Sequence, residues 1–71
     1  MAIEDKQADL YDKFFNVKDK LSDDQVRKLE DSFDFFGEIY EEADIEDLDK
    51  LLDQIEEMLC LYVIQQAVLS Q

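Results

Sequence analysis

Hydrophobic residues recur at helical spacing in three successive stretches of the chain. In the first stretch they lie three, four or seven residues apart and therefore share one helical face: Ile3, Leu10, Phe14, Val17 and Leu21. Aspartates and lysines repeat in the same stretch with a period of seven: Asp5, Asp12, Asp19, Lys6, Lys13 and Lys20. This pattern predicts an amphipathic helix over residues 3–20.

The second stretch begins with a signal for a helix N-terminus. Ser22 followed by Gln25 forms the spacing of a capping box, and two aspartates between them favour the positive end of the helix dipole. The hydrophobic residues then alternate in steps of three and four: Val26, Leu29, Phe33, Phe36, Tyr40 and Ala43. We expect a helix over residues 23–42. Gly37 lies inside it, where a close helix contact or a small kink could explain a glycine.

The third stretch is out of phase with the second. Continuing the second stripe past Ala43 gives only polar residues, whereas a new hydrophobic stripe starts at Ile45 and continues through Leu48, Leu52, Ile55, Leu59 and Tyr62. A break at Asp44, the expected N-cap, explains the change of phase. The third helix is expected over residues 45–69. Short connections favour an antiparallel arrangement, so we predict one all-α domain over residues 1–71, a compact three-helix bundle.

The end of the third helix has no polar side, because residues 58–64 read Met-Leu-Cys-Leu-Tyr-Val-Ile. A helix that is apolar all round must be covered all round, and two short helices cover only part of it. We therefore expect a homodimer through the third helix, with these residues in the contact: Leu59, Leu61, Tyr62, Ile64 and Val68. Two alternatives are a central, fully buried helix and a foreign partner that docks at the same place.

Few residues in the chain are suited to catalysis. It contains no histidine, one glycine and one cysteine, Cys60, which lies in the apolar run and is expected to be buried and inert. The carboxylates do not follow the spacing of a calcium loop. We therefore expect a protein that is not an enzyme and that has no metal site and no cofactor.

One tripeptide, Asp31-Ser32-Phe33, resembles the Asp-Ser-Leu motif of acyl carrier proteins, which are also small, acidic and helical. The resemblance implies a phosphopantetheine arm on Ser32. Carrier proteins present that serine at the start of a helix, however, whereas Ser32 falls in the middle of the predicted second helix. The alternative is a plain solvent-facing serine.

Acidic residues dominate the second and third helices. The net charge of the chain is −13; residues 1–28 hold 7 acids and 6 bases, and residues 29–71 hold 13 acids and one base. Many of the acids lie four residues apart in two rows: Glu30, Asp34, Glu38 and Glu42 on the second helix, and Asp49, Asp53 and Glu57 on the third. The first helix is balanced by its own lysines. Bare nucleic acid and anionic membranes would repel such a surface, so we expect a basic protein partner.

The spacing of the rows suggests what they could imitate. Residues four apart on a helix are about 6 Å apart, so two adjacent rows would present a charge roughly every 3 Å, close to the phosphate spacing of one DNA strand. The leading hypothesis is a cytoplasmic modulator of the phage or mobile-element type that blocks a nucleic-acid-binding protein. Phe35, beside the second-helix row, would add an aromatic contact. Two alternatives are a charged surface that only keeps the protein soluble, and a small adaptor that binds a client through the apolar third helix.

Overall fold

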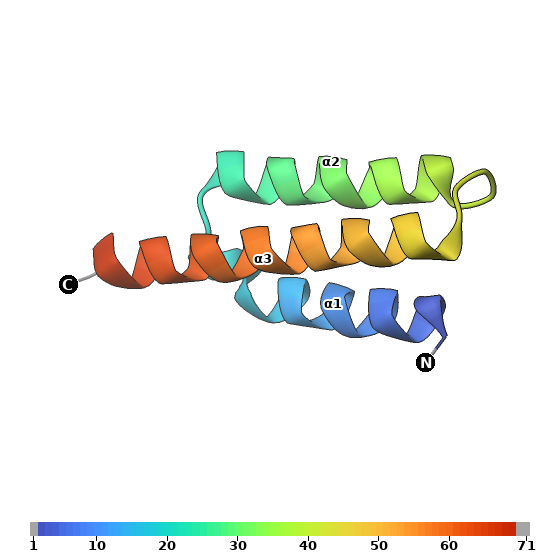
Figure 1. Cartoon of the computed structure of the whole chain (residues 1–71). Coiled ribbons are helices and arrows are strands. Elements are labelled where there is room, and N and C mark those ends of the chain that lie inside the picture. The colour runs from blue at the N-terminus through green and yellow to red at the C-terminus, as the bar shows by residue number, and fades with distance from the viewer. Residues whose placement is uncertain (1, 70–71) are drawn as a thin grey trace.

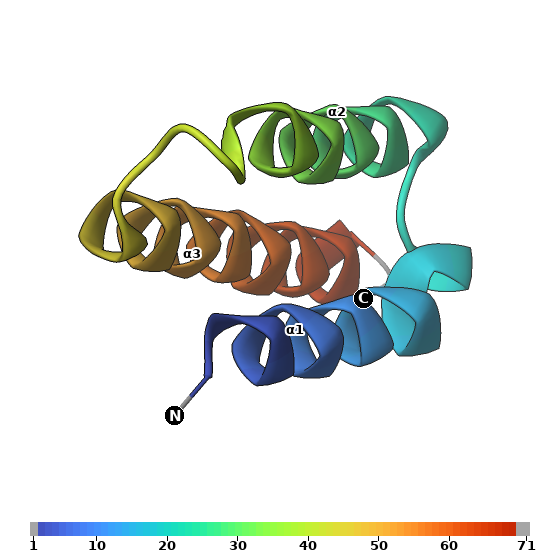
Figure 2. The same cartoon turned by 90° about the vertical axis from the view of Figure 1, so that its right-hand side faces the viewer.

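Three helices make up nearly all of the computed structural model, which describes residues 2–69 (Figure 1). They are α1 (Ile3–Val17), α2 (Asp23–Ile39) and α3 (Ile45–Leu69), and a short 3-10 turn over Lys18–Lys20 follows α1. The longest helix, α3, packs against both α1 and α2 (Figures 1 and 2). No strand occurs within the described residues. The expected all-α three-helix bundle is therefore confirmed.

Contacts between helix ends establish the direction of each helix. Gln25 at the start of α2 donates from its side-chain amide to Gln65 near the end of α3 (3.2 Å), so these two helices are antiparallel. The hydroxyl of Tyr40, just after α2, donates to Glu4 at the start of α1, so α1 and α2 are antiparallel as well. Since α3 reverses the direction of α2, it runs parallel to α1.

The core is formed by ten buried hydrophobic side chains, drawn from all three helices and from the turn before α2. Leu29, Phe36 and Leu52 have no exposed surface. The other seven are Leu10, Phe14, Leu21, Phe33, Leu48, Ile55 and Leu59. Every one of these residues belongs to a stripe found in the sequence. Ile45, the expected first member of the third stripe, is exposed because it is the first residue of α3 and lies at the end of the bundle.

The predicted helix starts are correct, and two predicted ends are too late. α1 ends at Val17 rather than at residue 20, because residues 18–20 form the 3-10 turn. Ser22 and Gln25 form the expected capping box: the Ser22 hydroxyl accepts from the Gln25 N–H (3.2 Å), and the Gln25 side chain accepts from the Ser22 N–H (3.1 Å). α3 begins directly after Asp44. However, α2 ends at Ile39 rather than at residue 42, and Glu42 lies in the following turn. Acidic residues are unfavourable at the negative end of a helix, and none of the bases lies there.

Gly37 has no packing role in the bundle. A β-carbon built at this position would meet no atom within 4 Å, so the close helix contact considered for it is wrong. We expect Gly37→Ala to stabilise the fold by about 0.5–1 kcal/mol, because glycine loses more backbone entropy than alanine on entering a helix. Thermal unfolding followed by circular dichroism would measure the change. An unchanged or lower midpoint would contradict it.

The hydrogen bond between Tyr40 and Glu4 connects α1 to the end of α2. It lowers the pKa of the Glu4 carboxyl, because the hydroxyl favours the ionised form, and it raises the pKa of Tyr40. A depressed carboxyl pKa contributes stability above the ordinary value, near 4.3, and that contribution is lost as the pH falls through the folded-state pKa.

Tyr40→Phe should therefore be less stable than the natural chain at pH 7, and the gap should shrink below about pH 4. Urea unfolding at pH 7 and at pH 3 would measure it. Tyr62→Phe is the matched control, since Tyr62 is also half-buried and its hydroxyl makes no hydrogen bond within residues 2–69. A gap that stays constant with pH would show that Glu4 is not involved.

Candidate partner-binding surfaces

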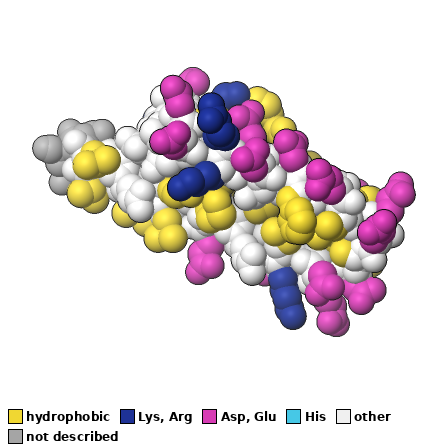
Figure 3. Space-filling view, turned by 90° about the horizontal axis from the view of Figure 1, so that it is seen from above, with side chains coloured by type: hydrophobic (Ala, Val, Ile, Leu, Met, Phe, Trp, Pro, Cys, Tyr) yellow, Lys and Arg dark blue, Asp and Glu magenta, His cyan; other side chains and the backbone are white. Residues whose placement is uncertain are grey.

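The acidic row of α2 is exposed and unpaired. Glu30, Asp34 and Glu38 are all exposed, and none of them forms an ion pair with another residue of the described chain. Figure 3 views the molecule from the α2 side: acidic side chains are spread over it, while most basic ones gather towards one end. Glu42, the fourth predicted member of the row, is exposed but lies beyond the helix. The helical row therefore has three members.

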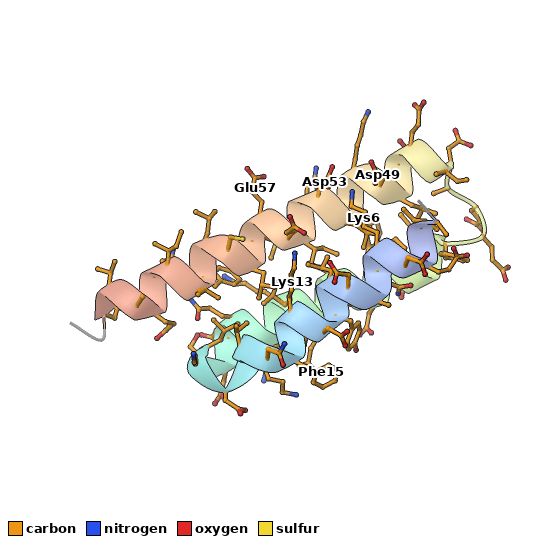
Figure 4. All side chains as sticks on the ribbon, turned by 90° about the horizontal axis from the view of Figure 1, so that it is seen from below. Lys6, Lys13, Phe15, Asp49, Asp53 and Glu57 are labelled. Atoms are coloured by element: carbon orange, nitrogen blue, oxygen red, sulfur yellow. The ribbon has the colours of Figure 1, made fainter. Side chains whose placement is uncertain are left out.

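The acidic row of α3 is partly neutralised by α1. The Lys6 ammonium lies 2.5 Å from an Asp49 carboxylate oxygen and 2.6 Å from one of Asp53 (Figure 4). These two hydrogen bonds, Asp49 first, raise the pKa of Lys6 by favouring its charged form. Glu57, the third member, is exposed and forms no ion pair within residues 2–69.

The sequence indicated that the α1 lysines balance the charge of their own helix; in the structure they also pair with acids of α3. Lys13 lies 3.5 Å from Glu56 of α3, closer than the 3.8 Å to Asp9 on its own helix. Lys6 and Lys13 are seven residues apart, so both lie on the flank of α1 that faces α3. The spacing of seven between these lysines is visible in the sequence. That they pair with acids of α3 could be recognised only once the direction of α3 relative to α1 was known.

Within residues 2–69, three aromatic side chains are exposed, Tyr11, Phe15 and Phe35, and Phe35 differs from the other two. Tyr11 packs on Phe15 and on Phe33, with ring centroids 5.2 and 4.6 Å apart, and the Lys18 ammonium lies 5.1 Å above the Phe15 ring. Phe35 is 50 % exposed and contacts no other ring within the described chain. It thus remains available for a contact beside the α2 row.

The C-terminal end of α3 extends beyond the ends of α1 and α2 (Figure 1). Leu61, Ile64 and Val68 are 55 %, 58 % and 64 % exposed. The other two residues assigned to self-association contribute to the monomer instead: Leu59 is buried in the core, and Tyr62 packs half-buried against it.

Cys60 is exposed, so the prediction of a buried thiol is wrong. It follows Leu59, the last buried member of the core stripe, and so points away from the core. With Ile64 it lines a shallow apolar groove between α1 and α3, whose other lining residues are Lys13, Val17, Leu59 and Val63.

Ser32 occupies the middle of α2 and is half-buried. Its hydroxyl donates to the carbonyl oxygen of Lys28 (2.9 Å), one helical turn earlier. This differs from the helix start at which carrier proteins present their serine. Among residues 2–69, no group of three or more acidic or cysteine side chains is arranged to hold a metal ion.

No protein-family model, curated protein or solved structure matches this chain. Across residues 2–69 there is no helical segment with the length and hydrophobicity that a bilayer-spanning helix requires. The fold and the surfaces define an acidic three-helix bundle with two exposed features: an unpaired row of carboxylates on α2 and an apolar end on α3.

Proposed function

We propose that this protein is a non-catalytic modulator that binds a basic, nucleic-acid-binding protein and occupies the surface meant for the nucleic acid. The observation that carries the proposal is the row Glu30, Asp34 and Glu38, which is exposed and unpaired although the chain has lysines elsewhere. Like charges four residues apart destabilise a helix by a few tenths of a kcal/mol per pair. An acidic row that is present despite this loss of helix stability is expected where a partner supplies the opposite charge.

The spacing of the row supports a phosphate-mimicking role. Carboxylates one helical turn apart are about 6 Å apart, which is close to two phosphate steps of about 3.4 Å along one DNA strand. The three carboxylates could therefore occupy positions of alternate phosphates, and Phe35 could add an apolar contact nearby. The α3 carboxylates Asp53 and Glu57 would extend the negative field, with Asp53 weakened by Lys6.

The test is a triple charge reversal with a matched control. The chain would be immobilised and used to bind basic proteins from a nuclease-treated extract, and proteins that duplex DNA displaces would be quantified. We expect Glu30→Lys, Asp34→Lys and Glu38→Lys together to abolish this binding with the fold retained. Reversal of Asp5, Asp12 and Asp19, all exposed outside α2, changes the net charge equally and should preserve it. Equal binding by both variants would refute the proposal.

A second candidate function rests on the exposed side chains Leu61, Ile64 and Val68. A small adaptor could cover an apolar helix of a client protein with them. Salt separates the two functions, because charge-led binding weakens as the Debye length falls from about 10 Å at 0.1 M to 3 Å at 1 M, and apolar binding does not. A complex that survives 1 M salt would favour the adaptor.

A further inference from the structure

One face of α3 is exposed along almost the whole length of the helix. Seven residues follow one another in steps of four and three, the spacing by which one helix meets another, and every one of them is exposed: Glu46, Lys50, Asp53, Glu57, Leu61, Ile64 and Val68. We call this set the outer stripe. It spans about 33 Å at 1.5 Å per residue, so it is long enough to contact a helix of about six turns.

The chemistry of the outer stripe changes once along its length. Up to Glu57 it carries three acids and one base, Lys50. The neighbouring Asp47 adds to the negative charge, whereas Asp49 and the stripe residue Asp53 share the single cation of Lys6. From residue 58 to residue 69 the sequence contains no charged residue at all. An occupant of the whole stripe must therefore offer cations to one half and apolar side chains to the other.

We propose that the outer stripe binds an amphipathic helix of a basic partner, with lysines or arginines opposite Glu46, Asp53 and Glu57, and apolar residues opposite the C-terminal half. This inference rests on the proposed function only in that the partner is basic, and it uses a different helix from the α2 row. Charge complementarity identifies the occupant: charges steer and orient the encounter, and helix-in-groove recognition supplies the apolar anchors.

A second copy of the chain does not fit the whole stripe. Two α3 helices packed in parallel would place acids against acids. Packed antiparallel over the whole stripe, they would place Glu57 against Glu57 of the other copy and would set Glu46 and Asp53 against its apolar end, which would take charges out of water without a partner of opposite sign. Self-association is therefore confined to the short apolar half and becomes a competing outcome of the test.

Synthetic helical peptides of about 22 residues provide the probe. Two peptides carry arginines at the facing positions of one half and leucines at those of the other, one with the arginines N-terminal and one with them C-terminal. A third peptide of the same composition alternates the two residue types along the facing positions. Fluorescence anisotropy should show one segregated peptide binding at least tenfold more tightly than the alternating one. Equal binding of all three would overturn the proposal.

Variants of the chain test whether binding occurs at the outer stripe. Leu61→Asp with Ile64→Asp, and separately Glu57→Lys, should each weaken the preferred peptide at least tenfold, whereas the α2 triple reversal should leave it nearly unchanged. Circular dichroism would check folding, which exposed positions should not affect. If peptide binding persists in the outer-stripe variants, the inference fails. The proposal for the α2 row is tested separately, by the binding of proteins that duplex DNA displaces. The α2 proposal and the outer-stripe proposal can therefore fail independently.

Sedimentation of the Cys60→Ser chain completes the test, because that substitution removes disulfide-linked dimers. A monomer at the concentrations used for anisotropy is the expected result. A stable dimer that Leu61→Asp dissociates, together with no preference among the peptides, would assign the stripe to a second copy and overturn the proposal.

Discussion

Phe36→Ala should lower the free energy of unfolding of the protein by about 3–5 kcal/mol. The Phe36 side chain has no exposed surface and packs 5.7 Å from the Tyr40 ring, measured between centroids. Truncating a buried phenylalanine to alanine costs about 3–5 kcal/mol, since the cavity left behind is only partly filled. A chain of 71 residues has a free energy of unfolding of only about 4–10 kcal/mol. The substitution therefore removes a large part of that margin.

Phe35→Ala is the matched control, because Phe35 is the neighbouring residue on the same helix and is half-exposed. A surface substitution of this kind changes stability by about 0.5 kcal/mol or less. Urea unfolding of both variants, followed by circular dichroism, would give the two free energies. Similar losses of stability in both variants would show that a different face of α2 points into the core. Retained stability in Phe35→Ala would also make that variant suitable for testing the aromatic contact with a partner.

The phase of the hydrophobic stripes explains why so much of the fold was predictable. The change of phase after Ala43 separated α2 from α3, and the pair Ser22 and Gln25 marked the start of α2; both are local signals. The core followed directly, because every buried residue lies on one of the three stripes. Helix ends are set by weaker effects, and the ends of α1 and α2 were each placed three residues too late.

Which surface residues are paired and which are exposed depends on how the helices lie relative to one another. The periodic pattern within one helix does not contain that information. Lys6 joins Asp49 and Asp53 across 43 and 47 residues of sequence, and only the parallel course of α1 and α3 makes that contact possible. The exposure of Cys60 depended on which side of α3 the other two helices leave uncovered. Exposure of Phe35, by contrast, was foreseeable, because it lies off the stripe that contains Phe33 and Phe36.

Asp34→Lys should raise the stability of the protein. Asp34 lies four residues from both Glu30 and Glu38, so the substitution replaces two repulsive pairs by two attractive ones. Each pair is worth about 0.2–0.5 kcal/mol in either direction, which gives a gain of about 1 kcal/mol in low salt. Thermal unfolding at low and at high salt would measure it, and the gain should fall as salt screens the pairs.

Asp31→Lys is the control with the same change in net charge. Asp31 lies four residues after Arg27 and three after Lys28, so a lysine there creates like-charge neighbours and should destabilise α2 slightly. Opposite signs for the two variants would show that the local arrangement of charges, rather than the net charge of −13, determines the stability of α2. A gain in both would mean that overall repulsion dominates.

The same Asp34→Lys variant should bind the basic partner at least tenfold more weakly, because it places a cation in the middle of the row that faces the partner's cations. A residue whose replacement improves the fold and impairs binding is characteristic of a binding surface, where stability and function oppose each other. A surface that served only for solubility would show the stability gain without the loss of binding. Measuring both properties on this one variant, with Asp31→Lys beside it, therefore distinguishes a functional acidic row from a merely solubilising one.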